Sequence, residues 1–289
     1  MRRSTRVILM IVLCTLVFTL AMSLMVNSVN LWIAWTRLGD EELYVAAVVV
    51  LYFLLPQIHQ GLVLALAILL SGSLNITLKY AFNMPRPPDP LIDVSGPSFP
   101  SGHAQISSSF WSALSFIAMN KLIAAISATV VVGISMSRVL LRAHYEMDVV
   151  GGALLGLAIG YTSYCSLAYY LKRRSDVLYY VFAGIAMAMS ACNAAIFNAE
   201  LSSSMTILGL SSAILTMLPV TKGRLARPSS SSMIARIVMS LVSVVLLWSV
   251  HLVTKSFDPL VRLACLYALG LYVFTMPLTL SLIAHKRFK

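Results

Sequence analysis

Long apolar runs separated by short polar segments dominate this sequence. A helix needs about 20 apolar residues to span the hydrocarbon core of a bilayer. By that measure the pattern predicts ten membrane-spanning helices, of which the second is short. They cover residues 6–27, 41–56, 59–80, 102–119, 122–142, 146–171, 176–196, 202–220, 232–253 and 260–284. The predicted fold is therefore an all-α, polytopic membrane helix bundle.

Composition agrees with a membrane protein. Of the 289 residues, 59% are hydrophobic and only 11% are charged, whereas a soluble domain carries about 25% charged residues. The first apolar run, after MRRSTR, could instead be a signal peptide, but its roughly 20 residues exceed the usual h-region. The net charge of +11 does not indicate nucleic acid as a partner, because the basic residues form short clusters between apolar runs.

The charges predict how the chain is oriented. Lys and Arg accumulate on cytoplasmic loops. If the N-terminus is cytoplasmic, the inner segments hold most of the 21 basic residues, and all of the ten acids except Asp176 lie outside. We therefore expect a multi-pass protein of the cell membrane with both termini in the cytoplasm. The segment between the third and fourth predicted helices is then extracytoplasmic.

Polar interruptions are concentrated in the first six predicted helices, and the polar segment KRRSD at 172–176 follows them. This predicts a six-helix core at 1–174 and additional transmembrane helices at 175–289. In the sixth predicted helix, Gly152, Gly156 and Gly160 recur every four residues, a spacing that lets another helix approach closely. The partner helix belongs either to the same chain or to a second copy in a homodimer.

One segment interrupts the apolar pattern with six prolines and several charges: NMPRPPDPLIDVSGPSFPSGHAQ at 83–105. Each polar residue near it has an ordinary explanation. Lys79 could reach the membrane interface, Ser101 could cap a helix, and His144 and Asp148 could form a surface pair. Taken together, the polar residues lie at the outer ends of neighbouring predicted helices. They are Lys79, Arg86, Ser101, Gly102, His103, Arg138, His144 and Asp148.

This set of residues suits phosphoryl transfer. Lys79, Arg86 and Arg138 supply cations for phosphate oxygens, and the helix N-terminus after Pro100 adds backbone N–H donors. Two histidines can act as nucleophile and general acid, while Asp148 can orient His144. We expect no metal and no cofactor, because the carboxylates are too few for a two-metal site.

The same residues resemble the three-part signature of the type 2 phosphatidic acid phosphatase superfamily. The matching segments are KYAFNMPRP (79–87), PSGH (100–103) and SRVLLRAHYEMD (137–148). The resemblance covers roughly residues 40–170 and implies a six-helix phosphatase core, so the helices of 176–284 are an addition to it.

The resemblance also implies a role for each site residue. His144 would be the nucleophile that becomes a phosphohistidine, and Asp148 would orient it. His103 would protonate the leaving oxygen and then activate water. The implied phosphate ligands are Lys79, Arg86, Ser101, Gly102 and Arg138.

An outward-facing site suits a lipid phosphate whose tail stays in the bilayer. The leading candidate is a polyprenyl diphosphate, undecaprenyl or dolichyl. Phosphatidic acid or phosphatidylglycerol phosphate comes next, followed by a sugar phosphate as in glucose-6-phosphatase. In a different class, the chain would be a lipid transporter or flippase whose site only binds phosphate.

The segment NLWIAWTRLGDEELY at 30–44 lies outside in this topology. Trp32 and Trp35 favour the headgroup level of a bilayer. They are expected either to anchor the surface or to guide a lipid sideways into the site. Asp40, Glu41 and Glu42 suit the N-terminus of the next helix, where the dipole favours anions.

Overall fold

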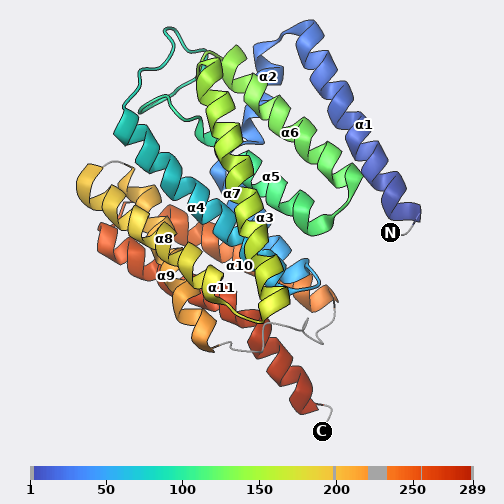
Figure 1. Cartoon of the computed structure of the whole chain (residues 1–289), viewed down its shortest axis with the longest axis vertical. Helices are drawn as coiled ribbons and strands as arrows, with labels where there is room; N and C mark the ends of the chain where they lie inside the picture. The colour runs from blue at the N-terminus through green and yellow to red at the C-terminus, as the bar shows by residue number, and fades with distance from the viewer. Residues whose placement is uncertain (1–2, 198–199, 221–232, 255, 288–289) are drawn as a thin grey trace. The chain divides into compact units, whose positions relative to one another are not determined.

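The computed structural model describes residues 3–197, 200–220, 233–254 and 256–287, and it is 84% helical, with no strand in these ranges. Figure 1 shows the helices in chain order. The elements are α1 (Arg3–Val26), α2 (Val29–Arg37), α3 (Glu41–Leu54), α4 (Ile58–Phe82), α5 (Gly102–Ala118), α6 (Lys121–Leu140), α7 (Glu146–Arg173), α8 (Val177–Cys192), the π-helical η1 (Asn193–Phe197), α9 (Leu201–Val220), α10 (Met233–Thr254) and α11 (Pro259–Arg287).

The all-α, polytopic fold class is confirmed, and each predicted helix is present with its ends shifted by a few residues. Within the described part of the chain, eight helices are long and apolar enough to cross a membrane. The predicted spans at α3 and α5 have only 14 and 17 residues. The nine-residue helix α2 was not predicted.

The chain forms two compact units. Unit 1 comprises Met1–Tyr44 and Leu78–Tyr164, and unit 2 comprises Val45–Thr77 and Cys165–Lys289. These packing units do not coincide with the predicted domains 1–174 and 175–289, because α3 and most of α4 group with the C-terminal helices. The two domains with a boundary near residue 174 stay a prediction.

In unit 1, close packing between α5 and α7 explains the glycine repeat. A Cβ atom at Gly152 would lie 2.6 Å from the Ser101 carbonyl oxygen, and Cβ atoms at Gly156 and Gly160 would also collide with α5. Glycine therefore lets the two helices touch, so that the backbone N–H of Ser101 donates to the Asp148 carbonyl at 3.0 Å. A homodimer through the same glycines stays a prediction.

The tryptophans of α2 face the inside of unit 1, so the expectation of a surface anchor or entry guide is wrong. Trp32 and Trp35 are 2% and 4% exposed and pack in a cluster with Leu141. Their N–H groups donate to Asn27 Oδ1 at 3.0 Å and to Ser23 Oγ at 3.2 Å. The protein thus supplies both the apolar surroundings and the polar partner that a membrane interface would have offered.

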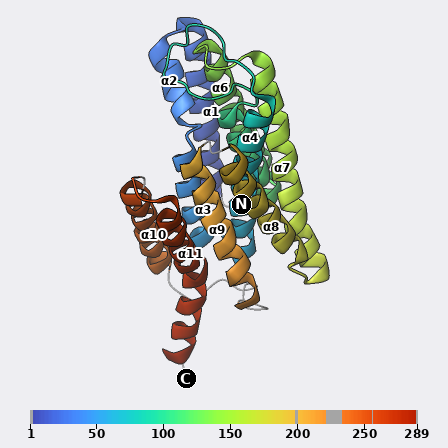
Figure 2. The ribbon, with the colours of Figure 1, turned by 90° about the vertical axis from the view of Figure 1, so that its left-hand side faces the viewer.

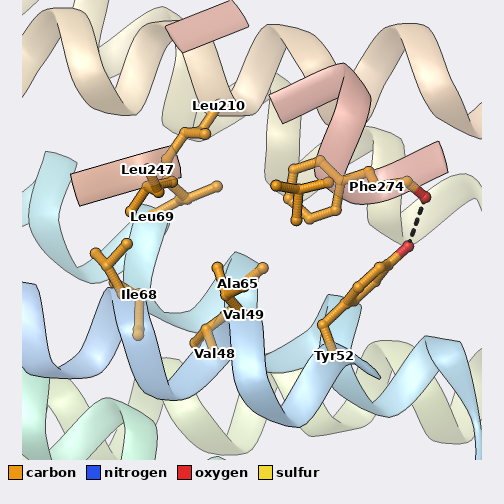
Figure 3. A pocket seen from close by; sticks show the side chains of 11 residues that line it. Val48, Val49, Tyr52, Ala65, Ile68, Leu69, Leu210, Leu247 and Phe274 are labelled. Carbon is orange, nitrogen blue, oxygen red and sulfur yellow. Dashed lines mark hydrogen bonds between the residues drawn. The ribbon is translucent and has the colours of Figure 1, made fainter. Parts of the chain in front are cut away.

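In unit 2, α9 packs against α8 and α11, and α10 packs against α11 (Figure 2). A small apolar cavity of about 40 Å³ lies among the side chains of α3, α4, α9, α10 and α11 (Figure 3). At its edge, the Tyr52 hydroxyl donates to the Phe274 carbonyl at 2.9 Å. The only hydroxyl in the lining is thereby satisfied, which leaves the cavity wall hydrocarbon in character.

Candidate functional site

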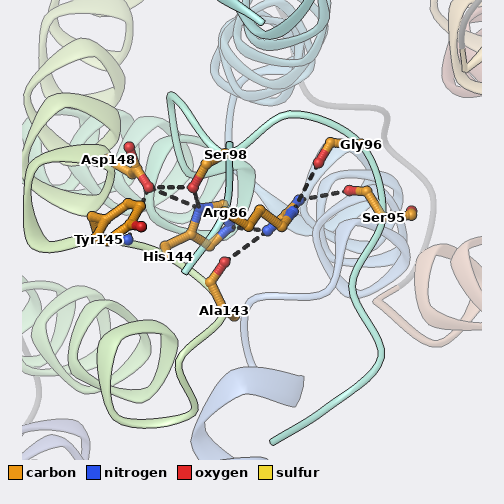
Figure 4. Close-up of polar contacts among 8 residues, drawn as sticks. All are labelled: Arg86, Ser95, Gly96, Ser98, Ala143, His144, Tyr145 and Asp148. Atoms are coloured by element: carbon orange, nitrogen blue, oxygen red, sulfur yellow. Dashed lines mark hydrogen bonds and ion pairs between the residues drawn. The ribbon is translucent and has the colours of Figure 1, made fainter. Parts of the chain in front are cut away.

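His144 lies in the turn between α6 and α7 and is 3% exposed. The end of α6 fixes this turn, because the Arg138 carbonyl accepts from the N–H groups of both Ala143 and His144. The two ring nitrogens face different partners (Figure 4). Nδ1 lies 3.6 Å from Asp148 Oδ2, and Nε2 lies 3.1 Å from Arg86 NH1. A proton on Nδ1 fits both contacts, and it leaves the Nε2 lone pair as the reactive group.

The carboxylate beside His144 is itself held in place. Asp148 is 4% exposed, and its Oδ2 accepts from the Tyr145 N–H at 2.9 Å and from the Ser98 hydroxyl. Ser98 is completely buried, and its Oγ also lies 3.4 Å from His144 Nδ1. Ser98 thus contacts both His144 and Asp148 and helps to hold the two side chains in position (Figure 4).

Electrostatics keep His144 neutral. Burial, followed by the positive charges of Arg86, Arg138 and Lys79, lowers the pKa of His144 from 6.5 to about 2. A neutral imidazole is the form that can attack phosphorus, since protonation would occupy the lone pair. The surrounding cations therefore serve two purposes, because they can also attract a phosphate.

The Pro-rich loop between α4 and α5 holds Arg86 rigidly. Its guanidinium donates to the carbonyl groups of Ser95, Gly96 and Ala143 at 2.7, 2.9 and 2.8 Å. Gly96 has φ +66°, a conformation that favours glycine. Because backbone carbonyls fix its position, Arg86 presents NH1 at the reactive nitrogen of His144 (Figure 4).

Ser101 occupies the N-cap position of α5, but its side chain makes no capping hydrogen bond. The residue is fully buried, and within the described ranges its Oγ has no hydrogen-bond partner. Gly102 is the first residue of α5. The hydroxyl of Ser101 and the first N–H groups of the helix form a set of donors suited to an anion.

Lys79 and Arg138 complete the cationic part of the site. They are 8% and 5% exposed and lie in the last turns of α4 and α6. NH1 of Arg138 donates to Thr36 Oγ1 at 2.7 Å, whereas its Nε has no partner in the parts of the chain that the structure describes. A buried guanidinium N–H without an acceptor is costly, and a phosphate oxygen would satisfy it.

His103, in the first turn of α5, pairs with a residue that the sequence analysis did not assign to the site. Its Nε2 lies 3.2 Å from Asp40 Oδ1. Gly39 makes the approach possible, since a Cβ atom there would lie 2.8 Å from His103 Cδ2. The sequence pattern predicts Asp40 only as an acid at the start of the next helix. Sequence offered no sign of this pair, because the partners are 63 residues apart.

Unit 1 therefore contains all eight predicted site residues, and it adds Asp40 and Ser98 to them. Contacts join His144 to Arg86 and Asp148, while Lys79 and Arg138 act on His144 through their charges. A surface cavity of about 400 Å³, lined by Pro87, Val139, Arg142, His144, Tyr145, Glu146 and Met147, opens beside the imidazole. The arrangement can hold an oxyanion in front of a neutral histidine and can deliver a proton.

Residues 60–172 match the model of the PAP2 superfamily. The matched segment starts in α4, ends in α7 and includes every site residue predicted from the sequence, whereas Asp40 precedes it. No curated protein and no solved structure matches the chain.

Proposed function

We propose that the chain hydrolyses a lipid phosphate in a membrane without a metal ion, because residues 60–172 match the model of the PAP2 superfamily, whose members are phosphatases of lipid or related phosphates. The leading substrate is a polyprenyl diphosphate, undecaprenyl or dolichyl, at the extracytoplasmic face. The observation that carries the proposal is His144, whose Nδ1 faces Asp148 and whose Nε2 faces Arg86.

In the first step, Nε2 of His144 attacks phosphorus. An N–P bond forms, the P–O bond to the leaving group breaks, and His103 gives a proton to the departing oxygen. The ring of His144 then carries a positive charge, which Asp148 stabilises from the Nδ1 side. NH1 of Arg86 lies 3.1 Å from Nε2, so from its fixed position it can donate to a phosphate oxygen once that nitrogen is bonded to phosphorus.

In the second step, His103, which lost its proton in the first, accepts one from water. The water oxygen forms a bond to phosphorus, the N–P bond breaks, and inorganic phosphate leaves. Throughout both steps, the donors around the phosphate are fixed before reaction, which is the most effective form of electrostatic stabilisation. These donors come from Lys79, Arg86, Ser101, Gly102 and Arg138.

Asp40 acts in this scheme as a positioning residue for the general acid. Its carboxylate lies against Nε2 of His103 and can accept the hydrogen bond of the proton that the general acid delivers. The same contact fixes the direction in which the ring points. Before substrate binds, the Nε2–H of His103 donates to Asp40. When substrate binds, the same N–H donates to the leaving oxygen instead.

Three cations around one phosphate position favour a highly charged substrate, and this supports a diphosphate over a simple monoester. The His144, Asp148 and Ser98 set supports an enzyme over a transporter or flippase, because binding alone needs no oriented nucleophile.

A substrate panel in detergent with EDTA tests the function. Undecaprenyl diphosphate, phosphatidic acid and glucose 6-phosphate are offered to the purified chain, and released phosphate is measured. We expect the highest kcat/KM for the diphosphate and full activity in EDTA. Loss of activity on chelation that Mg²⁺ restores would contradict the phosphohistidine mechanism. Tight binding of all three without phosphate release would indicate a transporter.

A further inference from the structure

Arg262 is a buried arginine in unit 2 whose guanidinium is only partly satisfied. The residue is 2% exposed. NH2 donates to Thr206 Oγ1 at 3.2 Å and lies 3.1 Å from His251 Nδ1. Nε and NH1, which carry three of the five N–H donors of a guanidinium, have no hydrogen-bond partner in the described ranges. Since unpaired buried donors are costly, this side chain requires an acceptor.

No described carboxylate neutralises Arg262, as the ion pairs of the described residues lie elsewhere. Asp258, four residues earlier, is exposed, and its Oδ1 accepts from the Leu260 N–H at 2.8 Å. The guanidinium contacts a hydroxyl and an imidazole, neither of which is a carboxylate. A buried charge without a counter-ion is expensive in any protein and marks a functional site in a membrane protein.

Two helix N-termini add positive potential at the same level. Contacts of Thr206 with Arg262, of Gly209 with Leu263, and of Ala213 with Gly270 show that α9 and α11 run parallel. Each helix N-terminus carries a partial positive charge of about one half. Arg262 lies in the first turn of α11, where the dipole disfavours a cation. Asp258 caps α11 through the Leu260 N–H but forms no ion pair with Arg262 in the described ranges, so an anion beside the guanidinium would still neutralise a buried cation.

We propose that Arg262, Thr206 and His251 form a second anion site, in unit 2, which binds a phosphate group. Arginine N–H groups match phosphate oxygens in geometry and charge. Arg262 is three residues from the start of α11, about 5 Å along its axis, so a phosphate reaches it from the headgroup level. The phosphate belongs either to an anionic lipid or to free inorganic phosphate. This site does not depend on the proposed hydrolysis.

Binding to the full chain in detergent tests this site. His144→Ala is the parent, because it stops turnover while the catalytic phosphate donors remain. Equilibrium dialysis with labelled inorganic phosphate and native mass spectrometry with dioctanoyl phosphatidic acid count the bound ligands. For at least one ligand we expect two equivalents per chain in the parent, and one after the additional Arg262→Gln substitution. If Arg262→Gln removes one bound equivalent of inorganic phosphate, the ligand of the site is the free anion. If it removes one equivalent of the lipid only, the ligand is a lipid headgroup.

Two comparisons keep the test independent of folding. Arg262→Gln in the otherwise unchanged chain should leave kcat for a short soluble phosphate unchanged, which would show that unit 1 is intact. Thr206→Val removes one acceptor of the guanidinium and should weaken the second site several-fold. The proposal would be overturned if Arg262→Gln left the number of bound equivalents unchanged for both inorganic phosphate and the lipid.

Discussion

At the scale of single residues, the site depends on which nitrogen of His144 is free to react. Nδ1 faces the carboxylate of Asp148, and Nε2 faces NH1 of Arg86. We expect His144→Ala to abolish both turnover and the phosphoenzyme, because the proposed mechanism has Nε2 of His144 form the bond to phosphorus. Asp148→Ala should lower kcat by about 10²–10⁴-fold, by comparison with triad carboxylates. Rapid acid quenching after labelled substrate measures the phosphoenzyme. An active, pure His144→Ala protein would remove the nucleophile assignment.

The Asp40–His103 pair makes a separate prediction that depends on the leaving group. If Asp40 positions the ring of His103, then Asp40→Asn should lower kcat about tenfold or more for an alkyl phosphate, whose oxygen needs a proton to leave. The effect should be small for 4-nitrophenyl phosphate, whose leaving group needs none. Steady-state kinetics with both substrates measure the difference, and Glu41→Gln is the matched control on the next residue. Equal losses on both substrates would mean that Asp40 is structural.

The lowered pKa of His144 predicts how stability depends on pH. The unfolded chain binds a proton near pH 6.5, whereas the folded chain binds it only near pH 2. The contribution of His144 to the free energy of unfolding is therefore fully present above pH 6.5. It decreases as the pH falls, by at most about 1.4 kcal/mol per pH unit. The melting temperature should drop between pH 7 and 5, and it should drop less in His144→Asn. Parallel curves for the two proteins would argue against a buried neutral histidine.

Sequence reasoning found the residues whose chemistry forms a known pattern and missed those that depend on tertiary contact. The eight signature residues could be found because their types and spacing point to phosphate chemistry. Ser98 could not be distinguished from Ser95 in the same loop, although only Ser98 contacts His144 and Asp148. Asp40 was missed because its partner comes from a distant helix.

At the scale of helices, apolar length predicted each long helix, since hydrophobicity over about 20 residues is a strong pattern. The short helix α2 was missed because its nine residues fall far below that length. The placement of Trp32 and Trp35 was wrong for a related reason. An amphipathic aromatic side chain suits both a membrane interface and a polar pocket in a protein, and only the fold, in which Gly133 of α6 leaves space beside Trp35, decides between them.

The α5–α7 contact predicts that one methyl group can damage the site from a distance. In Gly152→Ala, the new Cβ would lie 2.6 Å from the Ser101 carbonyl, so α7 must move away from α5 and carry Asp148 with it. We expect kcat to fall at least tenfold in the variant. Gly184→Ala in α8 is the matched control, since nothing lies within 4 Å of its Cβ, and alanine there favours the helix by up to about 1 kcal/mol. Full activity of Gly152→Ala would show that the helix contact does not position the site.

At the scale of the whole molecule, the charge distribution predicts an orientation in the membrane, and this orientation would decide which substrates the site can reach. The basic residues Lys172, Arg173 and Arg174 at the end of α7 predict a cytoplasmic α7–α8 connection, and the Pro-rich loop with its aspartates predicts an extracytoplasmic site. In a variant without its four native cysteines, Leu91→Cys should react with a membrane-impermeant maleimide in intact cells, because Leu91 is 46% exposed in that loop. Ser175→Cys, between α7 and α8, should react only after permeabilisation. The reverse pattern would place the site in the cytoplasm, where a lipid carrier released outside could not reach it.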